Sequence, residues 1–287
     1  MSLLSIIWNP DPVAFSMGEV EVRWYGIIYA TGFLFAIWLL GKMLKSEGCP
    51  DDWADKIFIY MVIAVIVGSR LGHVFFYDWD YYKDHIGEIF QIWKGGLASH
   101  GGAAAIIITV WLLAKYLCKK SFFWLADRMY VVCCSVAALI RIGNLMNSEI
   151  YGCETDLPWG FKFVRDYPGI PVEQIPACHP TQIYESLAYL VLFGILMWMY
   201  WRTDARKREG LICGTGFAVM FIMRFLIEFI KNDQSEFEAG MIINMGQILS
   251  IPFIIFGIWL IIRAMRKDKG ERRKETVTRN ESRTKFT

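Results

Sequence analysis

The sequence predicts an all-α integral membrane protein, built as a bundle of about seven transmembrane helices. Hydrophobic residues make up 55% of the 287-residue chain, and the mean hydropathy is +0.35, which is high for a soluble domain of this length. The apolar residues fall into runs of ~18–22, long enough to cross ~30 Å of hydrocarbon. The loops between these runs alternate between basic and acidic. Together these three observations exclude a soluble globular protein.

Seven spans are expected, at about 24–41, 57–76, 99–117, 122–140, 181–201, 210–230 and 242–262. The longest connection, about 143–180, is rich in proline, glycine and charge and forms a small extracytoplasmic loop region. Residues 1–266 therefore form one transmembrane domain. The tail 267–287 is basic and without periodicity, so we expect it to be disordered and cytoplasmic. The first fifteen residues lack a basic n-region and a small-residue cleavage site, so no removable signal peptide is expected.

Lysine and arginine in the short loops set the orientation. The loops after the first, third, fifth and seventh spans are basic, with Lys42, Lys45, Lys56, Lys115, Lys119, Lys120, Arg202, Arg206, Lys207, Arg208, Arg263 and Arg266. The alternate loops are acidic, with Asp78, Asp80, Asp84, Glu88, Glu154, Asp156, Asp166, Glu173, Asp233, Glu236 and Glu238. Basic loops stay in the cytoplasm, so the N-terminus is expected outside and the C-terminus in the cytoplasm.

The seven cysteines include no CxxC pair, and neither a metal site nor a cofactor is expected. Cys153 and Cys178 share one polar loop, which makes them the pair that an extracytoplasmic position would allow to form a disulfide.

Ionisable residues inside the spans are the first sign of function, because a charge at the bilayer centre costs ~2.5–3.5 kcal/mol on insertion scales. The spans contain Arg70, Asp127, Arg128, Arg141, Arg224 and Glu228. At 1.5 Å per residue, Arg70 lies ~10 Å below the outer end of its span. Arg141, Arg224 and Glu228 fall at a similar depth, near the outer head groups, whereas Asp127 and Arg128 lie closer to the cytoplasm.

Two readings of the sixth-span pair remain open. Arg224 and Glu228 are spaced i, i+4 on one helix face, so they suit either a self-neutralising ion pair or a binding site. Arg141 opens a segment that also holds Asn144, Asn147, Glu149 and Gly152, more polar groups than a helix cap needs. Guanidinium groups favour phosphate because their planar donor fork binds it bidentately.

A second concentrated segment, 94–102, places glycines on both sides of His100 at the start of a helix. The glycines let the backbone approach a ligand, and a helix start offers N–H groups to an anion. Imidazole is a base near neutral pH, so His100 is a candidate proton acceptor. His73 and His85 do not have glycines on both sides, and they are interpreted as structural.

These segments resemble the bacterial prolipoprotein diacylglyceryl transferases over about 24–263. The resemblance rests on Arg23–Gly26, Gly68–Gly72, the His100 segment, Arg141–Gly152, His179–Glu185, Arg224-x-x-x-Glu228 and Gly246–Ser250. Ile140, Leu145 and Met220 depart from the family pattern, replacing a glycine, a phenylalanine and a tyrosine.

The resemblance implies transfer of the sn-1,2-diacylglyceryl group of phosphatidylglycerol to the lipobox cysteine thiol of a preprolipoprotein, in the bacterial inner membrane. A thioether forms and glycerol phosphate is released. The implied catalytic residues are His100, Arg141, Arg224 and Glu228, with Glu228 orienting Arg224. The implied substrate-binding residues are Tyr25, Arg70, Asn144, Asn147, Glu149, Gly152, Tyr184 and Glu185.

Two other classes of protein fit parts of this pattern. A transporter or scramblase for anionic lipids would use the same arginines, but it needs polar residues at several depths and shows internal repeats in many cases. An intramembrane hydrolase needs a Ser–His or paired-Asp arrangement, and Ser99 and His100 point about 100° apart as neighbours on a helix.

Overall fold

The computed structural model describes residues 5–18, 20–232 and 243–284. Seven helices in this part of the chain are long and apolar enough to cross a membrane, which confirms the predicted fold class. They are α1 Trp24–Ser46, α2 Trp53–Phe76, α4 Ser99–Leu112 with its π-helical continuation Leu113–Cys118, α5 Phe122–Met146, α6 Thr181–Arg202, α7 Leu211–Ile227 with the 3-10 turn Glu228–Ile230, and α8 Met245–Thr284.

The chain divides into two compact units, Met1–Ala36 with Met129–Thr287, and Ile37–Arg128. The boundaries fall inside α1 and α5, so each of these helices contributes to both units. Met1–Ala36 with Met129–Thr287 form the first unit, and Ile37–Arg128 form the second unit.

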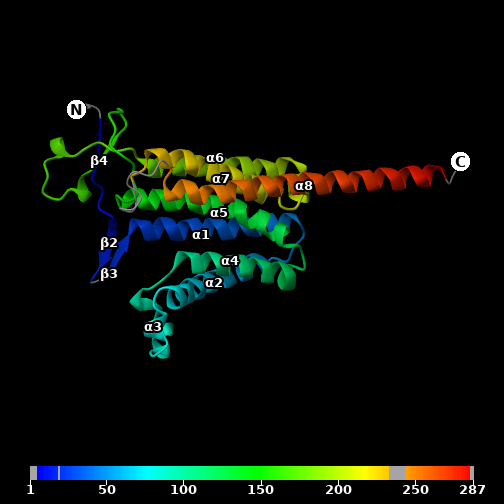
Figure 1. Cartoon of the computed structure of the whole chain (residues 1–287), viewed down its shortest axis with the longest axis horizontal. Coiled ribbons are helices and arrows are strands. Elements are labelled where there is room, and N and C mark those ends of the chain that lie inside the picture. The colour runs from blue at the N-terminus through cyan, green and yellow to red at the C-terminus, as the bar shows by residue number, and fades with distance from the viewer. Residues whose placement is uncertain (1–4, 19, 233–242, 285–287) are drawn as a thin grey trace. The chain divides into compact units, whose positions relative to one another are not determined.

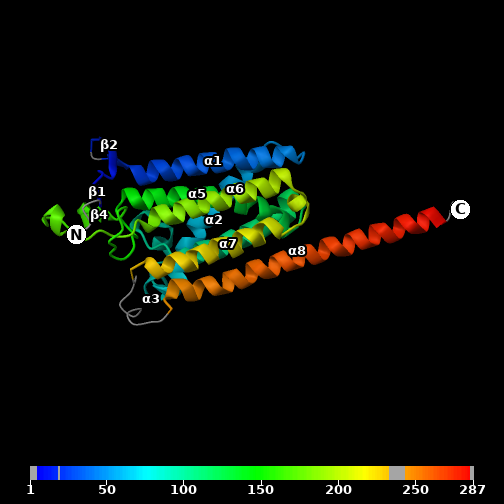
Figure 2. The same ribbon diagram turned by 90° about the horizontal axis from the view of Figure 1, so that it is seen from above.

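In the first unit, α5, α6, α7 and α8 lie side by side (Figures 1 and 2). Glycines allow this close approach. A Cβ atom at Gly214 of α7 would lie 2.8 Å from the Cβ of Leu260 and 2.9 Å from the carbonyl oxygen of Gly257 on α8. Small residues let the helix backbones pack in contact where lipid gives no hydrophobic driving force between helices.

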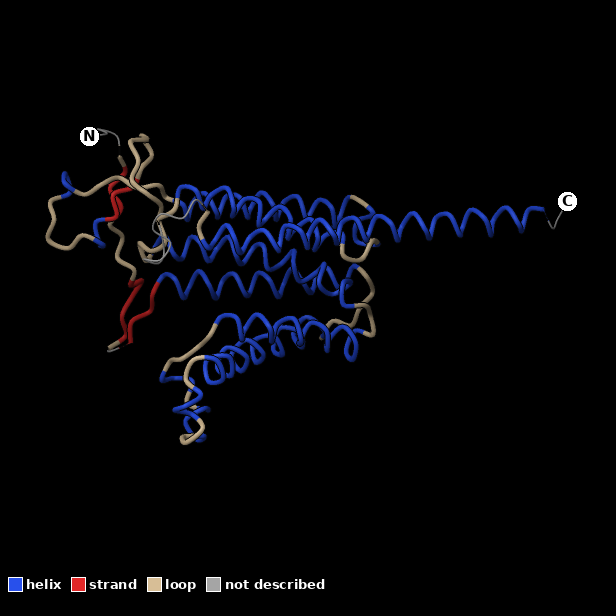
Figure 3. The backbone as a smooth tube through the Cα atoms, in the orientation of Figure 1, coloured by secondary structure: helices blue, strands red, loops and turns tan. Residues whose placement is uncertain are grey.

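Among the residues that the structure describes, four short strands accompany the helices, and they were not expected from the sequence (Figure 3). β1 (Ile6–Trp8) pairs in parallel with β4 (Phe161–Phe163), and β2 (Val13–Met17) forms an antiparallel hairpin with β3 (Val20–Arg23). Strands of three to five residues are too short to show a clear alternation of apolar and polar positions.

A small apolar cluster joins β1 and β4 to the end of α5. Leu145, Phe161, Phe163 and Cys178 are buried together, and the indole N–H of Trp8 donates to the carbonyl oxygen of Leu145 at 2.9 Å. Leu145, one of the departures from the family pattern, therefore supplies apolar packing at this point. The cluster fixes the connection that follows α5.

The second unit holds α2, α4, the short helix α3 (Trp79–Tyr82) and the 3-10 turns Ile86–Phe90 and Ile92–Lys94. One of its buried charges is Arg128, whose guanidinium binds both carboxylate oxygens of Glu47 at 2.8 Å and stacks 4.3 Å from the ring of Trp124. Arg128 therefore has a structural partner in its own unit.

The tail differs from its prediction, because α8 continues through it to Thr284. Residues after the span are rich in Arg, Lys and Glu, which have high helix propensity and extend a helix already begun by the apolar segment. Cys153 and Cys178 are free thiols in the structure. Burial, then the nearby Glu154, raises the pKa of the Cys178 thiol to about 11, as for an unreactive cysteine. Asp233, Glu236 and Glu238, used to predict the orientation, lie outside the described residues, and the orientation stays a prediction.

The contact between α2 and α4 gives a test of the packing. A Cβ atom at Gly72 would lie 2.7 Å from the Cα of Gly101, so we expect Gly72→Ala to lower the unfolding temperature in detergent by roughly 3–10 °C through overpacking. The control is Gly194→Ala in α6, where a Cβ atom meets nothing within 4 Å. Thermal unfolding of the two variants measures the difference, and equal temperatures would contradict this packing.

Candidate active site

The site lies in the first unit, at the end where α5 and α7 finish and α6 and α8 begin (Figures 1 and 2). Arg141 comes from the last turns of α5, with Asn144 one turn later on the same face. The Nε atom of Arg141 is 2.8 Å from Oε2 of Glu185 on α6, and its Nη1 donates to Oδ1 of Asn144 at 3.4 Å. The carboxylate of Glu185 is fully buried and the side chain of Arg141 is 15% exposed.

Glu185 also binds a second cation, which the sequence analysis missed. The ammonium group of Lys231 donates to Oε1 of Glu185 at 2.9 Å and lies 3.7 Å from Oε2 of Glu228. Lys231 is 2% exposed at its side chain. From the sequence it resembled a lysine that flanks a span, and its one signal was the i, i+3 spacing from Glu228. One buried carboxylate thus lies between two cations.

The predicted pairing of Arg224 with Glu228 is corrected by the structure. Glu228 contacts Lys231, and within the described ranges Arg224 forms no ion pair. Glu228 keeps a right-handed helical backbone, and its N–H donates to the carbonyl oxygen of Arg224, so the two residues still share one helix face. The carboxylate turns instead to Lys231, because the buried ammonium group needs an opposite charge more than the partly exposed Arg224 does. A Cβ atom at Gly246 of α8 would lie 2.5 Å from the Glu228 carboxyl carbon, so this glycine admits the carboxylate.

Arg224 nevertheless belongs to the same cluster. The backbone N–H of Glu228 donates to the carbonyl oxygen of Arg224, so Arg224 lies one turn before Glu228 on α7. Glu228 contacts Lys231, which is bound to the same carboxylate as Arg141. The side chain of Arg224 is partly exposed. Arg224 is therefore a cation beside the buried network, and no described carboxylate neutralises its charge.

The turn after α5 gathers amide groups around one carboxylate. Oε1 of Glu149 accepts hydrogen bonds from the side-chain amides of Asn144 at 2.8 Å and Asn147 at 3.2 Å. Tyr25 lies against the same segment, because a Cβ atom at Gly143 would be 2.7 Å from its ring. The structure thus brings together four predicted substrate-binding residues next to Arg141.

Gly152 and Tyr184 complete this end of the unit. Gly152 pairs with Lys231 in an isolated bridge, and its N–H donates to the carbonyl oxygen of His179 at 2.8 Å. A Cβ atom there would collide with the carbonyl oxygen of Ile230, so glycine is required for the bridge that positions Lys231. The hydroxyl of Tyr184 accepts from the indole of Trp159 at 2.9 Å and contacts Nδ1 of His179, whose pKa is lowered by burial.

Two predicted residues, Arg70 and His100, belong to the second unit. The guanidinium of Arg70 is buried and donates to the carbonyl oxygens of Glu88, Ile89, Gly95 and Gly96 at 2.6–3.3 Å. His100 is exposed, with its ring 5.3 Å from that of Phe76 and 5.6 Å from that of Tyr77. Their predicted place beside Arg141 stays a prediction.

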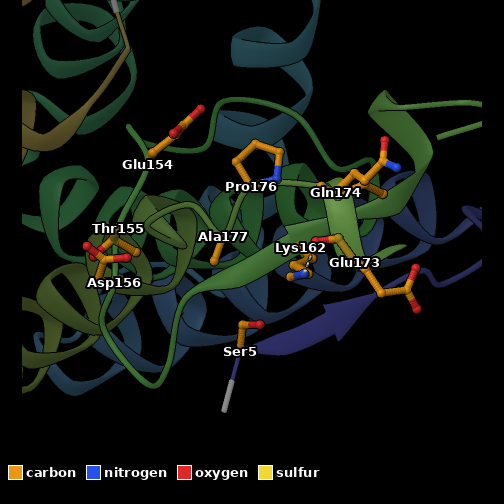
Figure 4. A pocket seen from close by; sticks show the side chains of 10 residues that line it. Ser5, Glu154, Thr155, Asp156, Lys162, Glu173, Gln174, Pro176 and Ala177 are labelled. Atoms are coloured by element: carbon orange, nitrogen blue, oxygen red, sulfur yellow. Dashed lines mark hydrogen bonds between the residues drawn. The ribbon is translucent and has the colours of Figure 1, made fainter. Parts of the chain in front are cut away.

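A polar cavity of about 520 Å³ lies elsewhere in the first unit, over β4 and the loop that follows it (Figure 4). Its lining includes Glu154, Asp156 and Glu173, and the ammonium group of Lys162 is bound by the carbonyl oxygens of Val172 and Glu173. Carboxylates repel an anionic substrate. The cavity contains none of the predicted site residues, and we place the site at the Arg141 cluster.

Fold and site together define an integral membrane protein that offers guanidinium, ammonium and amide donors to an anionic group at one end of a helix bundle. Such a site suits phosphate recognition, because fixed cations in a water-poor environment stabilise developing negative charge.

Comparison with known proteins identifies the family. The family model of prolipoprotein diacylglyceryl transferase matches residues 12–263. A phosphatidylglycerol–prolipoprotein diacylglyceryl transferase of Porphyromonas gingivalis is 46% identical over 269 residues, covering 91% of this chain and 95% of the relative. Proteins of the same name from Chloroherpeton thalassium and Bacteroides fragilis are 40% and 37% identical, covering 93% and 90% of this chain and 97% and 95% of the relatives. The chain belongs to the prolipoprotein diacylglyceryl transferase family, and the resemblance found in its sequence is confirmed.

The shared carboxylate gives a test of the buried network. Glu185→Gln removes the negative charge between Arg141 and Lys231, so we expect a loss of ~3–5 kcal/mol from uncompensated buried cations. The double variant with Lys231→Met removes one of those cations and should regain part of the loss. Thermal unfolding in detergent measures both. A Glu185→Gln variant as stable as the unsubstituted protein would argue against the network.

Proposed function

We propose that this chain transfers the sn-1,2-diacylglyceryl group of phosphatidylglycerol to the lipobox cysteine thiol of preprolipoproteins. Membership of the family and the names of its relatives support the reaction and both substrates. The observation that carries the proposal is Arg224, a cation without an ion pair in the described part of the chain, one turn before Glu228 in the same cluster as Arg141. A phospholipid phosphate is an anion that such a pair of guanidinium groups suits.

At the attacked carbon, the reaction forms one bond and breaks one. The acceptor thiol loses its proton, and the thiolate attacks the glycerol carbon that joins the diacylglyceryl group to the phosphate oxygen. The carbon–oxygen bond breaks, the oxygen keeps the electron pair, and glycerol phosphate leaves as a thioether forms. The leaving phosphate gains negative charge during this step, so cations placed beforehand lower the barrier. Arg141 and Arg224 have this role in our proposal.

The carboxylates orient these cations. Glu185 contacts the Nε edge of Arg141 and binds Lys231, which leaves the Nη atoms of Arg141 toward Asn144 and the ligand. Glu228 neutralises Lys231 from the other side, and we assign it this role in place of the orientation of Arg224. A buried network of this kind holds its members in one arrangement because a displaced charge would lose its partner.

The head-group glycerol would be bound by the side chains of the turn after α5. Asn144, Asn147 and Glu149 offer amide and carboxylate groups, and Tyr25 lies against their segment. Gly152 allows the close approach of backbone at the edge of this site, and Tyr184 presents a hydroxyl from the first turn of α6.

His100 is exposed at the start of α4 and is our candidate for the group that accepts the thiol proton, an effect worth typically ~10²–10⁴-fold. Arg70 takes part indirectly, because its donors are bound to the carbonyl oxygens of the loop that leads to α4.

Both substrates are amphipathic, so the reaction needs a membrane. The chain is a multi-pass membrane protein, and its named relatives are bacterial. We place it in the inner membrane with the Arg141 cluster at the extracytoplasmic side, on the distribution of lysine and arginine in its loops. A lipid transporter would need charges along a path, whereas the deeper Arg128 is bound to Glu47.

Purified protein incubated with labelled phosphatidylglycerol and a lipobox peptide tests this function. We expect Arg141→Ala to lower the rate of label transfer by at least ~10²-fold, the loss typical of one removed transition-state donor. Arg141→Lys keeps the charge without the planar fork and should lose less. A peptide with Ser in place of the acceptor Cys should accept no label.

The matched control is Arg165→Ala, an exposed arginine of the same unit outside the cluster, which should transfer label at the unsubstituted rate. Arg141→Ala that inserts normally and transfers label as fast as this control would refute the mechanism. Lipid flux without chemical conversion would favour a transporter.

A further inference from the structure

The turn after α5 has an unusual backbone. Ser148 and Ile150 have φ angles of 58° and 61°, in the left-handed region that glycine prefers. The conformation costs free energy in any L residue, and it is rarest for a β-branched side chain such as that of Ile150. Glu149 lies between these two strained residues. A backbone held in this way needs surrounding contacts that fix it, and such sites cluster where function requires a set geometry.

Two side chains from the first turn of α6 supply those contacts. The hydroxyl of Thr181 donates to the carbonyl oxygen of Ile150 at 3.0 Å, and the side-chain amide of Gln182 donates to that of Glu149 at 2.7 Å. Both side chains are fully buried. Polar groups at a helix start normally cap their own helix, whereas these two bind a segment more than thirty residues earlier in the chain.

The strained turn sets the direction of the Glu149 side chain. The backbone N–H of Glu149 donates to the carbonyl oxygen of Asn144 at 3.1 Å. Its carboxylate accepts hydrogen bonds from the side-chain amides of Asn144 and Asn147. Asn144 in turn accepts from Nη1 of Arg141. Contacts therefore run without a break from the start of α6, through the turn, to the guanidinium group.

We propose that Thr181 and Gln182 are positioning residues, which hold the 148–150 turn so that Glu149 orients Asn144 and Asn147 toward the head-group glycerol. This inference rests on the proposed function for its ligand. The two residues need not touch the phospholipid. They act through the geometry of the turn, so their loss should weaken binding of phosphatidylglycerol more than it slows the chemical step.

Hydrogen exchange of the unliganded protein tests whether Thr181 and Gln182 hold the 148–150 turn. Thr181→Val removes the hydroxyl at nearly constant shape, and Gln182→Met removes the amide. We expect each to raise exchange of the backbone amides of residues 147–152 by about tenfold, as for a lost buried hydrogen bond. Thr181→Ser keeps the donor and should exchange at the unsubstituted rate. Unchanged exchange in both Thr181→Val and Gln182→Met would overturn the proposal.

Steady-state kinetics with a rescue variant test the functional half. We expect Thr181→Val to raise KM for phosphatidylglycerol by about tenfold, the effect of one lost hydrogen bond to a buried group, with kcat changed far less. Ile150→Asn should restore much of this loss, because asparagine tolerates the left-handed region and no longer opposes the turn. Ile150 is 41% exposed, so the polar side chain is accommodated.

A purely structural role has a different signature. It would lower the amount of active protein, and hence the apparent kcat, at constant KM. Ile150→Asn would then give no rescue in the Thr181→Val background. That pattern would refute the positioning role. Failure of the proposed function is distinguishable, because the unsubstituted protein would then transfer no label while the exchange results stood unchanged.

Discussion

The organisation of the site depends on one carboxylate, that of Glu185, which lies between Arg141 and Lys231 with no exposure to solvent. A buried cation is costly without an opposite charge, and here one acid from α6 compensates two cations from the end of α5 and the segment after α7. Gly152 is needed because only a residue without a side chain can pass between Ile230 and Thr181 and let Lys231 reach that acid. Three segments far apart in the sequence are thereby tied at one point.

The spans were predictable because their signal is local. Runs of apolar residues long enough for a bilayer define seven helices whatever their neighbours are, and the observed ends agree to within a few residues. The strands were missed because β1 and β4 have three residues each and depend on the cluster around Leu145 and Phe163. Their pairing joins residues about 155 positions apart, which no local pattern reveals.

The site was predictable in its residue types more than in its pairings. The density of polar groups after Arg141 indicated Asn144, Asn147 and Glu149 as a group, and the structure places them in contact. The partner of Glu228 could not be read from i, i+4 spacing, since Arg224 and Lys231 both lie within one turn of it and the burial of Lys231 decides between them. Lys231 was missed because a lysine at the end of a span is ordinarily an interfacial anchor.

Arg70 has a mechanical consequence for the second unit. Its single planar group is bound to carbonyl oxygens at both ends of the 88–96 segment and is stacked 5.0 Å from the ring of Tyr82. The segment cannot move away from α2 by a hinge at one of its ends, because the buried guanidinium group of Arg70 would then lose its hydrogen-bond acceptors. The 88–96 segment must therefore move together with the last turns of α2 as one rigid body, and the start of α4 must move with it.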